Sequence, residues 1–302
     1  MAESRQSSSH LLPVGEALLT ALIWSSSFVG VKVALRSVGP FSLAAIRYFL
    51  AFLLLLPWVV AGWRRAASLT RAQWIDLALI GLFQYTVGNG ALFLALRVLP
   101  ATTGSLALCL VPIPVLVLGL VALKERPRAV QIVGLCVAVA ASVLFFLPGL
   151  RGMGSSSVAL LGVSILSFAV FPILVRKLAR TGTFDTVRLT ALPLGIGGGV
   201  LLLIAAPLEG VPHAPPAVWG VILGLAAVNT VLAYLLYNHS LRRLTAVEAD
   251  VLLNLTPLGT ALIAWGALGE RLSPLQIAAM FLVIGGATLA QWRAPKWVLR
   301  RR

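Results

Sequence analysis

The residues best suited to contact a ligand are polar and aromatic side chains set inside long apolar stretches. Tyr85 and Asn89 are four residues apart and share one face of a helix, while Trp24 lies close to Ser27 in another stretch. A polar group in an apolar environment is costly unless it faces a cavity or a hydrogen-bond partner. Aromatic rings with a few amide and hydroxyl groups are suited to binding a small amphipathic molecule.

The second half of the chain carries a matching set. Adding 145 to the residue number leads from Tyr85 to Thr230 and from Asn89 to Tyr234. We predict one binding cavity, lined by Trp24, Ser27, Tyr85, Asn89, Thr230, Tyr234, Tyr237, Asn254 and Trp265. The alternative is that the polar groups bond neighbouring helices and that the Trp and Tyr rings anchor at a membrane interface.

Sequence motifs for catalysis, metal binding or nucleotide binding are absent. Cys109 and Cys136 lie in apolar runs, which indicates packing residues rather than a disulfide or a zinc site. The three histidines are far apart, and no phosphate-binding loop occurs. We therefore expect no enzymatic activity, no ATP hydrolysis, no cofactor and no metal.

The elements that must position these residues are membrane helices. The chain is 59% hydrophobic and 11% charged, whereas soluble domains are about 45–50% apolar and about 25% charged. Stretches long enough to span a bilayer, about 17–25 residues, run near 14–35, 41–63, 74–96, 102–122, 129–147, 157–178, 187–207, 218–241, 246–268 and 273–292. These runs are too long for barrel strands, so we predict an all-α integral membrane protein with ten transmembrane helices.

The net charge of +15 indicates orientation rather than an acidic partner. With the N-terminus in the cytoplasm, 18 of the 24 Lys and Arg residues fall on the cytoplasmic side of the ten-helix arrangement. Both termini are therefore expected in the cytoplasm. Since no basic patch with interleaved aromatic residues occurs in a soluble region, we expect contact with lipid headgroups and no nucleic acid.

An internal repeat is the most informative pattern. At the 145-residue offset, Glu125 corresponds to Glu270, Arg126 to Arg271 and Gln131 to Gln276; Pro112 corresponds to Pro257 and Arg97 to Arg242. A repeat of five helices, an odd number, must cross the membrane in the opposite sense the second time. Inverted repeats around a midplane site are typical of secondary transporters, although some channels also have them.

Proline and charged side chains allow two interpretations each. Pro112 and Pro257 would kink matching helices, either as hinges for alternating access or as static bends. Glu270, like Glu125, is expected to cap a helix end, with proton coupling as the alternative. For Lys32 and Arg47 we favour snorkelling to lipid headgroups over attraction of an anionic substrate carboxylate.

Several motifs resemble those of the drug/metabolite transporter superfamily, and within it the EamA-type ten-helix exporters. They are Trp24 to Phe28 followed by Lys32, the Ala45-Ile-Arg47-Tyr-Phe segment, Pro112 with Leu123-Lys-Glu125-Arg126, and Pro257 with Leu268-Gly-Glu270-Arg271-Leu-Ser. The resemblance covers essentially the whole chain. It implies a ten-helix inverted-repeat fold, a central cavity lined by helices 1, 3, 4, 6, 8 and 9, and export of small metabolites, with an aromatic amino acid exporter as a plausible close relative.

The expected organisation is therefore one transport domain. Residues 1–13 form a cytoplasmic tail, 14–150 the first five-helix repeat, 151–292 the second, inverted repeat and 293–302 a basic cytoplasmic tail. We expect a monomeric secondary exporter of amino acids, including aromatic ones, in a bacterial inner membrane. The alternatives are an exporter of other amphipathic metabolites or drugs, a passive channel or lipid scramblase, and an integral-membrane enzyme.

Overall fold

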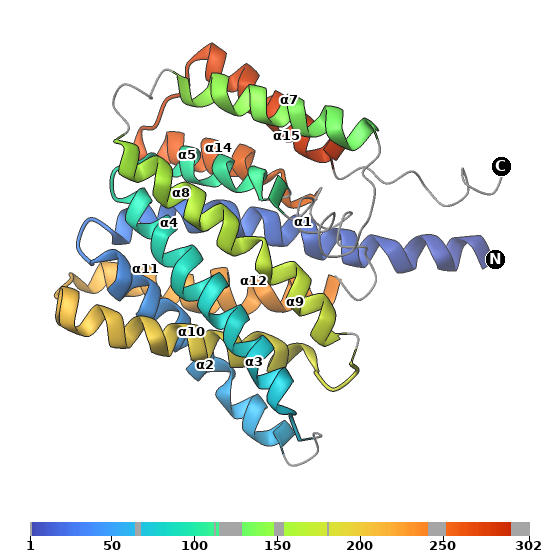
Figure 1. The fold of residues 1–302 in the computed structure, drawn as a ribbon, viewed down its shortest axis with the longest axis vertical. Coiled ribbons are helices and arrows are strands. Elements are labelled where there is room, and N and C mark those ends of the chain that lie inside the picture. The colour runs from blue at the N-terminus through green and yellow to red at the C-terminus, as the bar shows by residue number, and fades with distance from the viewer. Residues whose placement is uncertain are drawn as a thin grey trace.

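The computed structural model describes residues 2–63, 68–111, 113–114, 129–147, 154–179, 181–240 and 252–290. Within these residues the protein is all helical, with no strand (Figure 1). The first half contains α1 (Ala2–Ala34), α2 (Pro40–Trp63), α3 (Arg71–Ile80), η1 (Gly81–Gly88), α4 (Asn89–Leu96), α5 (Ala101–Ala107), η2 (Leu108–Leu110) and α7 (Ala129–Phe146). The second half contains α8 (Ser155–Phe168), α9 (Val170–Ala179), α10 (Thr186–Glu209), α11 (Pro216–Ala226), η4 (Ala227–Leu232), α12 (Ala233–Ser240), α14 (Thr256–Leu268) and α15 (Pro274–Ala290).

Six helical segments of the described chain are long and apolar enough to cross a membrane. They are Leu12–Ala34, Pro40–Gly62, Arg71–Leu96, Ser155–Val175, Thr186–Glu209 and Pro216–Ser240. Shorter apolar helices cover Ala101–Leu110, Ile132–Phe146, Thr256–Leu268 and Pro274–Leu289. The all-helical prediction is confirmed for these residues. The ends of the predicted spans at 102–122 and 246–268 fall partly outside the described residues.

The outer surface is apolar, and a set of polar side chains is buried in the otherwise apolar interior. Leu203 and Leu262 expose 78% and 72% of their area, whereas Thr230 and Thr260 expose none. This distribution suits a protein that faces lipid. Apolar side chains gain nothing by leaving lipid for the interior, whereas exposing polar side chains to lipid is costly.

The strongest helix packing joins elements that the internal repeat equates. α2 packs along α10, and α7 packs along α15, a pair at the upper edge of Figure 1. Glycine permits close approach in both pairs: a Cβ atom on Gly198 would lie 2.6 Å from the backbone nitrogen of Phe49, and one on Gly286 would lie 2.5 Å from that of Ala138. Small residues at helix interfaces are typical of membrane bundles.

Two of the spans contain a π-helical segment in the middle. η1 interrupts the span formed by α3 and α4, and η4 interrupts the span formed by α11 and α12. Adding 145 to the bounds of η1 gives 226–233, which encloses η4. π-Helical turns are rare and occur frequently at functional sites. Their matched placement therefore indicates a candidate functional site at the middle of these two spans.

A second matched irregularity precedes the repeated prolines. The helix that begins with α5 tightens into the 3₁₀ segment η2, and the equivalent residues of the second half form a turn at Asn254 and Leu255. Pro257 is therefore the second residue of α14, where proline is well tolerated. The expectation of a kink inside a continuous helix is wrong for Pro257, because the helix breaks before it. Pro112 lies outside the described residues.

The end of the bundle opposite the N-terminus, called the distal end below, is held by charged side chains at helix termini. The Glu209 carboxylate accepts hydrogen bonds from the backbone nitrogens of Phe41 (3.1 Å) and Ser42 (2.8 Å) at the start of α2. The Glu270 carboxylate accepts from the nitrogens of Ala101 (2.7 Å) and Thr102 (3.1 Å) at the start of α5. Negative charge at a helix N-terminus is stabilising, and the capping role expected of Glu270 is confirmed. Glu125 lies outside the described residues.

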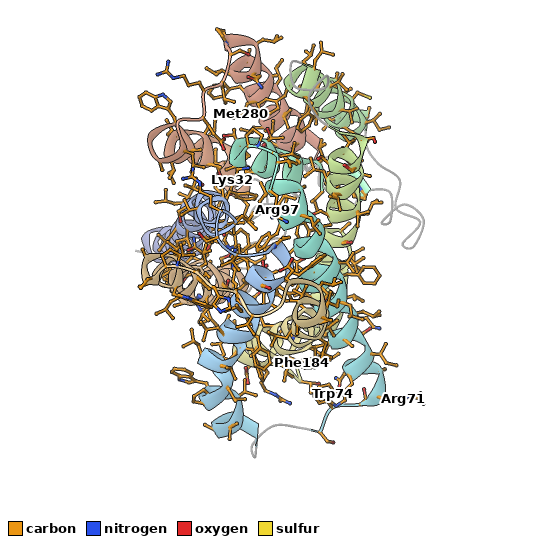
Figure 2. The ribbon with its side chains drawn as sticks, turned by 90° about the vertical axis from the view of Figure 1, so that its left-hand side faces the viewer. Lys32, Arg71, Trp74, Arg97, Phe184 and Met280 are labelled. Carbon is orange, nitrogen blue, oxygen red and sulfur yellow. The ribbon has the colours of Figure 1, made fainter. Side chains whose placement is uncertain are left out.

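Lys32 holds the same distal turn from the other side. Its Nζ donates to the carbonyl oxygens of Leu96 (2.7 Å) and Leu99 (2.8 Å), and to that of Arg97 at 3.3 Å. Figure 2, which views this end, shows Lys32 and Arg97 close together. The expectation that Lys32 snorkels is therefore wrong, because its ammonium group binds the carbonyls at the end of α4, where positive charge is favourable.

Candidate functional site

The centre of the candidate site is the Arg47 side chain on α2, which is 4% exposed. Its Nε donates to Thr230 Oγ1 at 2.9 Å and its Nη2 to the carbonyl oxygen of Asn229 at 3.3 Å, both in η4. The guanidinium also lies over the rings of Tyr48 (5.2 Å) and Phe93 (5.9 Å). The expectation of snorkelling is thus wrong for Arg47: it points into the bundle, not toward headgroups.

The π-helical geometry of η4 makes this contact possible. Thr230 Oγ1 donates to the carbonyl oxygen of Leu225, five residues earlier, at 2.9 Å. Asn229 Nδ2 donates to the carbonyl of Ile23 (2.5 Å) and to Ser26 Oγ (2.9 Å), both on α1. Through η4, therefore, one polar network joins α1, α2 and the span containing η4.

Aromatic rings surround this network. Tyr234 is the hub, with ring centroids 5.3 Å from Trp24, 5.8 Å from Tyr85 and 6.2 Å from Phe171. Tyr85 continues to Tyr48 at 5.0 Å, and edge-to-face or tilted pairs at such separations are favourable. The rings come from α1, α2, η1, α9 and α12, so the cluster lies where both halves meet.

Tyr237 extends the cluster toward the other end of the bundle. Its ring lies 5.5 Å from that of Trp24 and is 7% exposed. Trp24 is half-buried and sits between Tyr234 and Tyr237. The side chains Trp24, Tyr85, Thr230, Tyr234 and Tyr237, predicted as cavity residues, are thus brought together in one cluster.

The amides near η1 have two different roles. Gln84 Nε2 donates to the Tyr234 hydroxyl at 3.1 Å, while the buried Gln84 Oε1 has no hydrogen-bond partner among the described residues. Asn89 Nδ2 donates to the Gln84 carbonyl at 2.7 Å. Asn89 therefore stabilises the π-helical turn, which matches the alternative of bonding within the helices.

The remaining predicted residues lie around the crossing of α1 and α14. Ser25 Oγ donates to the Thr256 carbonyl at 3.0 Å, and Thr260 Oγ1 donates to the Ser25 carbonyl at 3.3 Å. Ser27 is buried two residues further along α1. Asn254 is buried in the turn before α14, and its Nδ2 has no partner in the described part of the chain.

Trp265 does not join the cluster. Its side chain is 64% exposed near the distal end of α14. That position matches the alternative of a ring anchored at the membrane interface, where tryptophan is enriched.

Reasoning from sequence missed Tyr48, Gln84 and Asn229 as residues of the site, and it gave Arg47 a role there only as the alternative to snorkelling. For Arg47, the signal in the sequence was its distance from the helix end. It is seven residues past the start of α2, about 10 Å along the helix axis at 1.5 Å per residue. A side chain placed so far inside needs an internal partner, and η4 provides it.

A separate cleft of about 930 Å³ opens at the distal end between α4, α5, α8 and α15. Its polar side chains are those of Arg97, Thr103, Ser156, Ser157 and Gln276. None of the cluster residues lines it. In the described ranges, no three His, Cys, Asp or Glu side chains gather in a group that could hold a metal ion.

The apolar exterior, the spanning helices and the buried polar side chains define a multi-pass membrane protein. Comparison with known proteins identifies its kind: residues 13–147 and 155–291 each match the EamA-like transporter family. The chain belongs to this family of membrane transporters.

Relatives match along nearly the full length. An uncharacterized transporter of Archaeoglobus fulgidus is 30% identical over 93% of this chain and 94% of its own. A protein of Streptantibioticus cattleyicolor named a probable terminal-alkyne amino-acid exporter is 26% identical over 91% and 92%. The uncharacterized inner membrane transporter YedA of Escherichia coli is 25% identical over 92% and 90%.

The fold is shared with a known crystal structure. That structure superimposes with a TM-score of 0.67 and covers 98% of both chains at 19% identity. The similarity of fold therefore covers nearly the full length of both chains.

Proposed function

We propose that the protein is a secondary exporter of small amphipathic metabolites, with amino acids, including aromatic ones, as its substrates. It transports them by alternating access between two inverted five-helix halves, residues 14–150 and 151–292, with ten spans in all. The observation that carries this proposal is the repetition of irregular helices around one buried cluster. η1 and η4 match at the 145-residue offset, as do η2 and the Asn254–Leu255 turn.

Irregular helices at matched positions suit a carrier because they can change shape at little cost. Transporters of this type place discontinuous helices next to a midplane site and move one repeat against the other. The cluster lies at the middle of the spans and draws its rings from both halves. A site so placed can open toward either end of the bundle.

Amino acids fit the lining. Aromatic rings supply apolar contact, while Gln84 Oε1 and Asn254 Nδ2 are buried polar atoms without described partners. A relative named a probable terminal-alkyne amino-acid exporter supports this substrate class. An aromatic amino acid exporter is the subtype that the rings favour, and an enzyme is disfavoured by the transporter family.

Charge and relatives support an orientation and a location. Lys and Arg are in excess in the connections that lie on the same side of the membrane as the two termini, which favours cytoplasmic termini. An inner membrane transporter among the relatives favours a bacterial inner membrane. The distal end then faces outward, and the protein is proposed to act as a monomer.

The test is flux into liposomes containing the purified full-length protein. A panel of labelled amino acids is offered with and without a pH gradient, against protein-free liposomes. We expect saturable uptake of at least one aromatic amino acid. Flux that rises without saturation indicates a channel, and no flux for any amino acid contradicts the substrate assignment.

The helix break before Pro257 is proposed as a hinge. Pro257→Ala permits a continuous helix there, since alanine restores the backbone donor that proline lacks. We expect the transport rate to change more than the substrate affinity. A loss of affinity at unchanged maximal rate contradicts the hinge.

A further inference from the structure

Arg47 is a buried cation for which the described residues provide no acidic partner. Its hydrogen bonds go to the neutral groups of Thr230 and Asn229. Every carboxylate whose side chain is described binds elsewhere. Glu16 contacts His239, Asp76 contacts Lys177, Asp185 caps α10, and Glu209 and Glu270 cap α2 and α5.

An uncompensated charge inside a membrane protein is costly and marks a functional position. The rings of Tyr48 and Phe93 offset part of this cost by cation–π contact. An anion bound at Arg47 would offset the part of the cost that remains.

The guanidinium of Arg47 retains the geometry that binds such an anion. Nε and one Nη2 hydrogen are directed to η4, and the described residues accept no hydrogen bond from Nη1. The edge formed by Nη1 and Nη2 is therefore available. A planar edge with two parallel N–H donors matches the two oxygens of a carboxylate.

We infer that Arg47 binds the carboxylate of the transported solute, which makes the substrate class organic acids and amino acids with an apolar or aromatic body. This inference rests on the proposed transport function and specifies its ligand. The rings of Tyr48, Tyr85 and Tyr234 contact the body of the solute. The unpartnered Gln84 Oε1, next to the Tyr234 hydroxyl, accepts a hydrogen bond from an amino group.

The test compares ligands that differ only in the acid group. Binding of L-phenylalanine and L-phenylalaninamide is measured on the purified full-length protein, and leucine with leucinamide provides a second pair. A charge-assisted, bidentate contact predicts that the acid binds about ten- to hundredfold more tightly than the amide.

Substitutions assign this preference to Arg47. Arg47→Gln is expected to reduce the acid-to-amide ratio to about one, and Arg47→Lys to an intermediate value, since lysine keeps the charge without the fork. Lys32→Gln is the matched control, because its ammonium group binds the distal turn; it should retain the wild-type ratio. If Arg47→Gln fails to fold, Thr230→Val replaces it and should lower the ratio by releasing Nε.

The outcomes separate this inference from the proposed function. Equal binding of acid and amide, binding of neither acid, or an unchanged ratio in a folded Arg47 variant overturns the role of Arg47. If flux of an amino acid in liposomes persists in those cases, transport stands and only the role of Arg47 is wrong. Absence of flux for every amino acid of the panel, with the acid-to-amide ratio intact, contradicts the proposed transport of amino acids and leaves the role of Arg47 standing.

Discussion

The π-helical segments η1 and η4 occupy matching positions in the two halves, yet different interactions fix them. η1 lies directly against α10, where Gly81 and Gly197 bring the two backbones together. η4 is fixed by hydrogen bonds from Asn229 to α1 and from Arg47 on α2. The π-helical segment is therefore repeated in both halves, while the buried charge of Arg47 is hydrogen-bonded to η4 and not, among the described residues, to η1.

This difference separates two requirements of a carrier. A repeated scaffold allows the two halves to exchange shape, but a ligand with two distinct ends needs an asymmetric site. Tyr85 and Thr230, which the repeat equates, show the division: one contributes a ring and the other accepts the Arg47 hydrogen bond.

The largest effect is expected where η1 meets α10. Gly197→Val places side-chain atoms against the Gly81 carbonyl and the Tyr85 Cβ. Overpacking of this kind costs about 1–3 kcal/mol and sometimes more, so we expect a marked drop in the unfolding temperature of the purified protein. Gly199→Val is the control, because nothing lies within 4 Å of its added Cβ; an equal drop in both variants would refute close packing as the cause.

A smaller loss is expected from the hydrogen bonds of η4. Asn229→Ala removes the donor that bonds Ile23 and Ser26 on α1. Two buried bonds are worth about 1–3 kcal/mol together, again measured by thermal unfolding. Thr86→Val in η1 removes one bond, to the Gly197 carbonyl at 3.0 Å, and should cost about half as much. If Thr86→Val costs more stability than Asn229→Ala, hydrogen bonds fix η1 more strongly than η4, which contradicts this account.

The smallest effect is expected at the hydrogen bond between Gln84 in η1 and Tyr234 in α12. Tyr234→Phe keeps the aromatic ring but removes the hydroxyl that accepts from Gln84. One neutral hydrogen bond corresponds to about 0.5–1.5 kcal/mol, so we expect a modest rise in the substrate concentration at half-maximal transport. Tyr234→Leu, which also removes the ring contacts, should be clearly worse; equal defects would mean that the hydroxyl alone matters.

The sequence predicted the helices but not their irregularities. Apolar runs such as 41–63 and 187–207 correspond closely to α2 and α10 because lipid requires continuous helix wherever the chain is apolar. The π-helical turns at η1 and η4 carry no comparable signal, since they depend on hydrogen bonds such as Asn89 to Gln84.

The site was predictable in part for the same reason. Tyr85, Thr230 and Tyr234 were found because helical periodicity and the repeat agree on their faces. Arg47 was assigned to the membrane interface, because its partner in η4 lies 182 residues away in sequence. Trp265 lies at helical spacing from Asn254 but faces outward. Helical spacing shows which residues share a face of the helix, but not whether that face contacts the cluster or the lipid.

The central claim, that a single site formed by both halves opens alternately to each side, is tested most directly by counterflow. Liposomes containing the protein are loaded with an unlabelled substrate from the amino-acid panel, and a trace of the same substrate, labelled, is added outside. A carrier predicts transient accumulation of label above its equilibrium level. A simple rise to equilibrium, identical in loaded and empty liposomes, would contradict alternating access.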